Sequence, residues 1–206
     1  MLTKLRNLLI STALLATATT ASANLIVNGS FEDNTVSNGN WSWFNSSVVN
    51  GWEGSNIEIW HNLNGISAVD GVQIAELNAD GPNSGAWSIF QDFSTVIGQV
   101  YDVSFSYRAR TGSTTASSEA FIFSVGSLLK TVDDHTTAGW SLFQSSFTAT
   151  SAVTQLRFTS LNSGTYGNLL DNVVVNAKKS VPESNPLALF AIGALGLLLI
   201  RKHRTV

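Results

Sequence analysis

Few residues of this chain could do covalent chemistry. There is no cysteine, which excludes cysteine nucleophiles, disulfide scaffolds and thiolate zinc sites. Outside the C-terminal tail the only histidines are His61 and His135, and no His-Glu-x-x-His, Gly-x-Ser-x-Gly or phosphate-binding glycine loop occurs. A glycosidase needs two carboxylates about 5–10 Å apart, for which Glu53, Glu58 and Glu76 are the candidates. The sequence favours a non-catalytic protein, with a hydrolase as the alternative.

Tryptophan side chains offer a second kind of chemistry. Sugar binding needs aromatic faces against pyranose C–H groups and planar polar groups that satisfy hydroxyls. All six tryptophans lie in residues 41–140. Trp41 and Trp43 stand among Asn, Ser and Gly residues and are the best candidates for a binding surface, although alternate residues of a short strand share this spacing. Trp60 and Trp140 are open to either role, and the other two are expected to pack in the core.

Two arginines follow the clearest alternating run of the chain. Apolar residues occupy every second position from Tyr101 to Tyr107, so Arg108 and Arg110 are predicted to share the opposite, polar face of that strand. There they could bind sugar hydroxyls or a uronate carboxylate. The other interpretation is an ordinary solvated face, with ion pairs to Asp102 or Glu119.

Charge is distributed unevenly. The whole chain has 11 basic and 14 acidic residues and a net charge of −3. Residues 24–177 hold only four of the basic residues but thirteen of the acidic ones, a net charge of −9. A nucleic-acid partner is excluded, because it would require a basic face. An acidic polysaccharide would also be repelled, so a neutral or calcium-crosslinked glycan is expected.

The two ends of the chain are predicted to be targeting segments. Residues 1–23 have the pattern of a signal peptide: Lys4 and Arg6, an apolar stretch over residues 8–16, and a small-residue cleavage site at Ala21-Ser22-Ala23. Near the other end, residues 187–200 are uncharged and apolar. With flanking residues they predict a transmembrane helix over 185–200. The basic end 201–204 is expected to lie in the cytoplasm, which puts residues 24–177 on the opposite side of the membrane.

The C-terminal arrangement resembles the PEP-CTERM sorting signal of Gram-negative bacteria. Its motif is Val181-Pro182-Glu183, after which Ser184 replaces the second proline of the family pattern. The resemblance covers residues 181–204. It implies processing by an exosortase-like enzyme after signal peptidase has acted, and the substitution at Ser184 puts efficient processing in question.

Residues 24–177 are predicted to form one all-β domain. Alternation at period two recurs, as in Phe121, Phe123 and Val125, and turn signals such as Asp70-Gly71 and Ala138-Gly139 separate the runs. Eight or nine short strands, the first at residues 25–27, favour an antiparallel β-sandwich or jelly roll. Residues 133–135, Asp-Asp-His, are predicted to be a polar turn, with a metal site as the alternative.

The ordered motifs of this domain resemble a known family. They run from Leu25-Ile26-Val27-Asn28-Gly29-Ser30-Phe31-Glu32, through Gly98-Gln99-Val100-Tyr101, to Leu170-Asp171-Asn172-Val173. In this order they are similar to galactose-binding-like jelly rolls of carbohydrate-binding modules, especially the cell-wall-associated domains of plants and their bacterial relatives. The resemblance implies a structural calcium ion where the first and last strands meet, with Glu32 and Asp171 as its carboxylates. The alternative is that Glu32 makes a surface hydrogen bond and Asp171 caps a turn.

The sequence thus predicts an exported, non-catalytic protein of the cell surface or extracellular matrix. Its β-sandwich would bind carbohydrate, and the PEP-CTERM resemblance implies an exopolysaccharide. A C-terminal helix would hold it in the inner membrane at least transiently. A structural surface or biofilm protein without a specific ligand would have the same composition and stays open.

Overall fold

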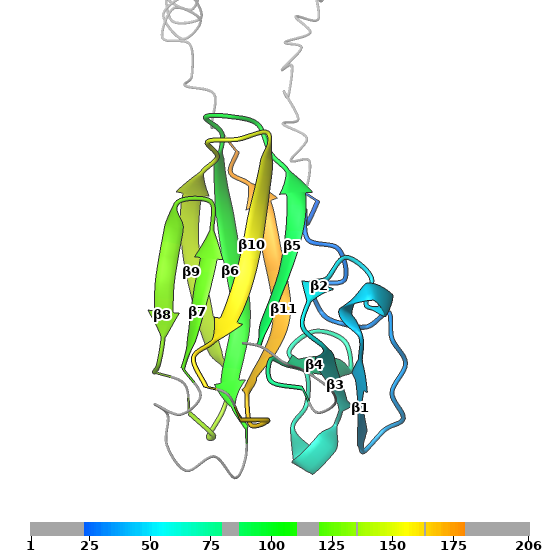
Figure 1. Ribbon diagram of the computed structural model, residues 1–206. Helices are drawn as coiled ribbons and strands as arrows, with labels where there is room; N and C mark the ends of the chain where they lie inside the picture. The colour runs from blue at the N-terminus through cyan, green and yellow to red at the C-terminus, as the bar shows by residue number, and fades with distance from the viewer. Residues whose placement is uncertain (1–22, 80–86, 111–119, 135, 163, 180–206) are drawn as a thin grey trace, which may run out of the picture.

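The computed structural model describes residues 23–79, 87–110, 120–134, 136–162 and 164–179 (Figure 1). Nearly all of the predicted signal peptide, residues 1–22, lies outside the described residues. So do the sorting motif Val181-Pro182-Glu183, the predicted helix 185–200 and the basic end 201–204. Within the described ranges, no helix has the length and apolar character needed to cross a membrane.

The described chain is built from strands in two antiparallel sheets, which confirms the all-β sandwich. The six-stranded sheet has the order β1-β3-β4-β11-β6-β9 and the five-stranded sheet the order β2-β5-β10-β7-β8. The strands are β1 (Asn40–Phe44), β2 (Glu53–Gly54), β3 (Ile57–His61), β4 (Gln73–Glu76), β5 (Ser88–Ser94), β6 (Val100–Ala109), β7 (Phe121–Val125), β8 (Leu128–Val132), β9 (Ser141–Thr148), β10 (Val153–Ser160) and β11 (Asn168–Ala177), with short 3-10 helices η1 (Ser46–Val48) and η2 (Leu63–Gly65).

The main core lies between the two sheets and is rich in aromatic side chains. Phe105 of β6 is fully buried, and its ring centroid lies 4.7 Å from both Phe123 and Phe143 and 4.9 Å from Phe158. Such offset and edge-on ring pairs add to the free energy gained by burial. The predicted alternation of β6 is therefore confirmed, because its apolar face closes this core.

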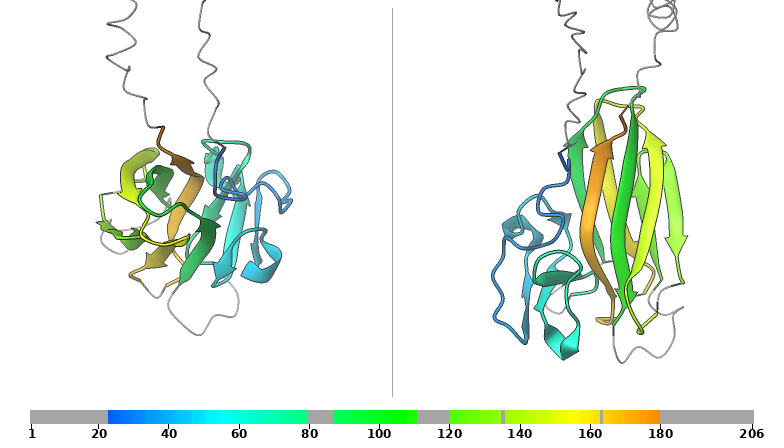
Figure 2. Two further views of the ribbon diagram at one scale, coloured as in Figure 1. Left: turned by 90° about the horizontal axis from the view of Figure 1, so that it is seen from above. Right: turned by 180° about the vertical axis from the view of Figure 1, so that it is seen from behind.

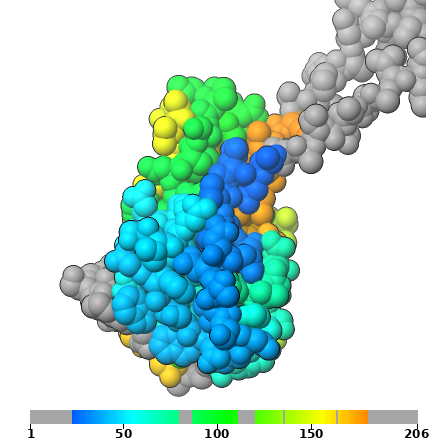
Figure 3. All heavy atoms as spheres, turned by 90° about the vertical axis from the view of Figure 1, so that its right-hand side faces the viewer, coloured from blue at the N-terminus to red at the C-terminus, as the bar shows by residue number. Residues whose placement is uncertain are grey.

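The N-terminal segment lies beside β11 but is not a strand, contrary to the prediction for residues 25–27. Leu25 N donates to Val175 O and Val173 N donates to Gly29 O, both at 2.9 Å. The chain bends at residues 25–26 and turns over residues 27–30, and Asn28 and Phe31 take left-handed φ values of 50° and 57° that do not occur in a strand. Figures 2 and 3 show this blue segment running along the edge of the sandwich next to β11 and the cyan residues that follow it.

A second, smaller core lies on the outer face of the six-stranded sheet. Trp60, Ile74 and Leu169 point away from the main core and pack with Ile66 of the β3–β4 connection. Trp140, which directly precedes β9, packs against the same cluster, and its Nε1 donates to Ser67 O at 3.0 Å. The connection therefore covers the middle of the outer face and leaves sheet surface exposed on either side.

Candidate functional site

Strand pairing brings the predicted tryptophans together on the outer face of the six-stranded sheet. Trp41 and Trp43 of β1 lie directly opposite Trp60 and Glu58 of β3, so the four side chains share one face. Trp41 and Trp43 are 42% and 40% exposed, whereas Trp60 is fully buried. Trp41 and Trp43 can therefore meet a ligand, and Trp60 packs beneath its neighbours.

Two glutamates lie side by side next to these tryptophans. Glu58 of β3 is the direct partner of Glu76 of β4, and both are buried. Trp60 Nε1 donates to Glu58 Oε1 at 2.6 Å, and Gly167 N donates to Glu76 Oε1 at 2.8 Å. Burial raises the pKa of Glu76 well above its usual value, and the neighbouring Glu58 raises it further, while the Gly167 amide and Arg110 act in the opposite direction.

Arg110 joins this pair to the aromatic side chains. Its Nη1 lies 3.0 Å from Glu76 Oε1, and its guanidinium lies 5.1 Å from the Trp60 ring centroid and 4.1 Å from that of Tyr166. Tyr166 is 50% exposed. We call Trp41, Trp43, Tyr166 and Arg110 the aromatic platform. The exposed Tyr166 ring lies against the Arg110 guanidinium, and the buried Trp60 links this pair to Trp41, its direct partner on β1.

Arg108 and Trp140 form a neighbouring pair on the same face. The Arg108 guanidinium lies 5.8 Å from the Trp140 ring centroid, and its Nη2 donates to Thr137 O at 2.6 Å. Among the described residues, Arg110 pairs with Glu76, and Asp102 pairs with Lys178 at 3.6 Å rather than with an arginine. Glu119 lies outside the described residues, so a pairing with it stays a prediction. All six predicted binding residues nevertheless share one sheet face.

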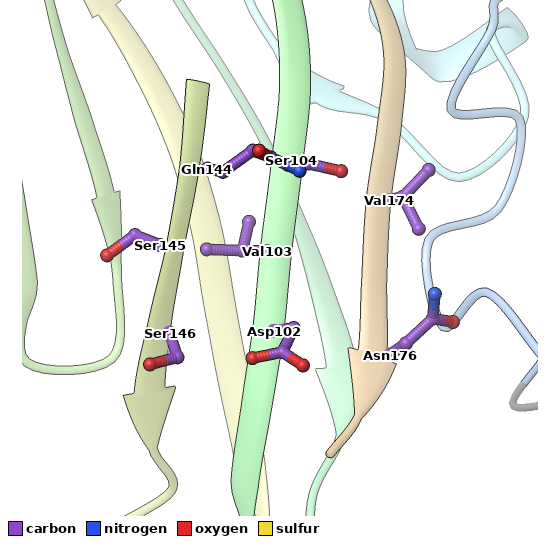
Figure 4. A pocket seen from close by; sticks show the side chains of 8 residues that line it. All are labelled: Asp102, Val103, Ser104, Gln144, Ser145, Ser146, Val174 and Asn176. Carbon is purple, nitrogen blue, oxygen red and sulfur yellow. The ribbon is translucent and has the colours of Figure 1, made fainter. Parts of the chain in front are cut away.

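A polar groove occupies the other exposed part of this face (Figure 4). It crosses β9, β6 and β11 and has a volume of about 520 Å³. Its side chains carry hydroxyl, amide and carboxylate groups around an aliphatic one. The residues that line it are Asp102, Val103, Ser104, Gln144, Ser145, Ser146, Val174 and Asn176.

The predicted calcium carboxylates lie around one short loop, residues 69–73. Glu32 Oε1 accepts hydrogen bonds from Val72 N and Gln73 N at 2.8 and 2.7 Å. Asp171 Oδ2 accepts from the amides of residues 69 and 70, and its Oδ1 accepts from Asn172 N. Burial raises the pKa of Asp171 to about 6, although these amides act to lower it.

Backbone amides donate to Glu32 Oε1 and to both carboxylate oxygens of Asp171, which are the kinds of contact named by the alternative interpretation, a hydrogen bond of Glu32 and a turn capped by Asp171. Among the described residues, no three His, Asp or Glu side chains converge. Calcium binding is tested by neither observation and stays a prediction.

The remaining candidates are dispersed. Glu53 lies on β2, in the other sheet from Glu58 and Glu76. In the predicted polar turn, Asp134 accepts a hydrogen bond from Tyr107 Oη at 2.8 Å. Burial and Asp134 raise the Tyr107 pKa to about 12, and His135 lies outside the described residues.

Sequence reasoning missed Tyr166 and the groove. Tyr166 stands in the turn Gly164-Thr165-Tyr166-Gly167, a polar, glycine-rich context like that of Trp41, and this signal could have identified it. The groove left no such signal, because its side chains are of types that are common throughout the chain.

Family membership follows from a sequence match over residues 24–176 to the model of a protein family of unknown function, DUF642. The chain belongs to the DUF642 family. No curated protein sequence matches it. The matched residues span the whole sandwich, so the fold described above is the fold of this DUF642 domain.

Several solved structures align with this chain at low sequence identity. An arabinose-bound α-L-arabinofuranosidase of family GH51 aligns at a TM-score of 0.50 with 13% identity, over 77% of this chain and 27% of that one. A CBM4 structure aligns at 0.45 with 22% identity, over 74% and 99%. The CBM22-1 xylan-binding domain of Xyn10C from Paenibacillus barcinonensis aligns at 0.46 with 16% identity, over 80% and 100%.

Proposed function

We propose that this DUF642 protein is a non-catalytic carbohydrate-binding module that contacts glycans through the aromatic platform. One observation carries the proposal: Trp41 and Trp43 are exposed on one sheet face, and the exposed Tyr166 ring lies against Arg110, an arginine fixed by a buried carboxylate. Aromatic rings of this size normally pack in a core. Here they are exposed, and they form a surface suited to the C–H faces of sugars.

Arg110 would provide orientation within this surface. Its ion pair with Glu76 and its contact with the Trp60 ring hold the guanidinium in one place, so little side-chain entropy would be lost when a sugar hydroxyl binds.

The glutamate pair supports binding rather than hydrolysis. Glu58 and Glu76 are the only two of the three candidate acids that lie together, and both are buried and hydrogen-bonded. A general acid and a nucleophile must reach the glycosidic oxygen and the anomeric carbon, which these carboxylates do not. A structural surface protein without a ligand is the second candidate.

The proposal includes export and sorting. The ligand would be a neutral exopolysaccharide of the cell surface or extracellular matrix, and the PEP-CTERM-like segment would hold the chain in the inner membrane until an exosortase-like enzyme acts. The mass of the mature protein tests this part. Loss of residues 1–23 supports export, and an intact N-terminus contradicts it.

The binding proposal is tested by alanine substitution of Trp41 and Trp43 in the full chain, with binding to neutral polysaccharides measured by affinity electrophoresis. Each stacked ring is worth about 1 kcal/mol, so the double variant should weaken binding by at least tenfold. Leu129→Ala, an exposed apolar residue of β8, is the matched control. Binding that survives the double substitution overturns the platform.

A further inference from the structure

The polar groove is a regular array of side chains on three neighbouring strands. Asp102 of β6 is the direct partner of Ser146 on one side and of Asn176 on the other. Two residues further along β6, Ser104 is the partner of Gln144 and Val174. The array therefore forms two rows of three side chains, all pointing away from the main core (Figure 4).

Much of its hydrogen-bonding capacity is directed outward. The side chains of Ser104, Gln144 and Ser146 make no hydrogen bond within the described part of the chain, and the latter two are exposed. Among the described residues, Asp102 has only a solvent-exposed pairing with Lys178 at 3.6 Å. Val174 places an aliphatic side chain at the same surface, so the groove combines an apolar contact with several short polar groups.

The groove is separate from the aromatic platform. The next residues along the strands, Ser106 of β6 and Asp171 of β11, are buried, and the amides of residues 69 and 70 bond to Asp171. This row is covered on β6 and β11, while its member on β9, Leu142, is exposed; the row divides the sheet face. Ser104 and Arg108 are about 13 Å apart along β6, from a rise of about 3.3 Å per residue.

We propose that this groove is a second binding site, for a neutral, polyhydroxylated ligand, so that one chain holds a glycan at two places. This inference rests on the proposed function. The volume lies in the range of about 300–1,000 Å³ that is usual for small-molecule sites. Hydroxyl and amide groups suit sugar hydroxyls, while Asp102 and the acidic domain disfavour uronates.

Two sites on one chain would be recognised by the dependence of affinity on glycan length. A second contact on the same polymer becomes intramolecular and can raise the overall affinity by about 10²–10⁴. Short oligosaccharides would fill the two sites separately, whereas a long polysaccharide would bridge the covered row between them.

The test compares Gln144→Ala/Ser146→Ala with Trp41→Ala/Trp43→Ala in the full chain. Isothermal titration uses xylan, mannan and β-1,4-galactan together with their trisaccharides. For a glycan that binds, the parent chain should take up two trisaccharides and each double variant one. Affinity for the long polymer should fall at least tenfold in either variant. Thr131→Ala, on the other sheet, is the control, and an unchanged melting temperature shows that each variant is folded.

Three results are decisive. If the parent chain binds one trisaccharide and only the tryptophan variant loses it, the groove is not a binding site and the proposed function stands. Uptake unchanged in Gln144→Ala/Ser146→Ala, and also in Ser146→Lys, which would fill the groove, overturns it as well. No binding to any of these glycans overturns the proposed function and the groove together.

Discussion

At the scale of single residues, Asp171 makes stability depend on pH. Burial raises its pKa from 3.8 to about 6, so the folded state keeps a proton that the unfolded chain has already lost. The contribution of Asp171 to the free energy of unfolding is greatest below pH 4 and is lost as the pH rises to about 6. The decrease is about 3 kcal/mol, from 1.36 kcal/mol per pKa unit. Glu76, whose pKa is also raised, acts in the same direction.

Urea denaturation of the full chain between pH 4 and pH 7 measures this effect. Asp171→Asn should remove most of the dependence attributed to Asp171, because the amide does not ionise. It should also lower stability at pH 4 by about 1–3 kcal/mol, since its NH₂ group faces backbone donors. A parent chain whose stability is flat or rises over this range contradicts the prediction.

Arg110 and Glu76 allow a second test by substitution. Arg110→Ala should lower the free energy of unfolding by about 2–4 kcal/mol at pH 7, because it leaves Glu76 buried without its cation. Adding Glu76→Gln removes the ionisable group that would otherwise stay buried without a cation and should restore part of the loss. Chemical denaturation of the two single variants and the double variant gives the coupling, and simple additivity would show that the pair is unimportant.

At the scale of elements, the docking of the N-terminal segment depends on a glycine. A Cβ at Gly29 would collide with the carbonyl oxygen of Val173, which faces this segment across its hydrogen bonds to β11. Gly29→Ala should lower the free energy of unfolding by about 1–3 kcal/mol, measured by thermal denaturation. Gly139→Ala, where a Cβ meets nothing within 4 Å, is the control and should change little.

The strands could be predicted from the alternation of apolar and polar residues, but which strands lie next to each other in the sheets could not. The residues from Tyr101 to Tyr107 predicted both the strand β6 and its buried face, because apolar and polar residue types alternate with the same period as burial in a strand. The contact of Arg110 with Glu76 joins β6 to β4 across β11, and no local pattern encodes the strand order. Trp60 was ambiguous for the same reason: its burial depends on the β3–β4 connection folding over it.

At the scale of the whole molecule, the negative charge of residues 24–177 should select among glycans. At low salt the parent chain is expected to bind a neutral glycan more tightly than a uronate polymer of similar backbone. Added salt should reduce this difference in affinity, because it screens the long-range repulsion between the acidic domain and the uronate carboxylates. Affinity electrophoresis at two ionic strengths measures it, and tighter uronate binding at low salt would contradict the expectation.

The amide contacts of Glu32 and Asp171 lead to an expectation about metal removal. Backbone N–H groups already hold the loop at residues 69–73. If these hydrogen bonds are the only role of the two carboxylates, a chelator should leave the melting temperature of the full chain unchanged. A clear fall after chelation, reversed by added calcium, would support the predicted ion instead.

The position of the domain's two ends has a consequence for how it can be joined to other proteins. Asn24 bonds through its side chain to Val173 and Val175 of the last strand, so the chain enters and leaves the sandwich at neighbouring points (Figure 1). A short linker between residues 24 and 177 could close the domain into a ring, and new ends could then be opened at a distant turn. The same proximity makes the sandwich an insertable unit, which a host loop can accept without moving its own flanks apart.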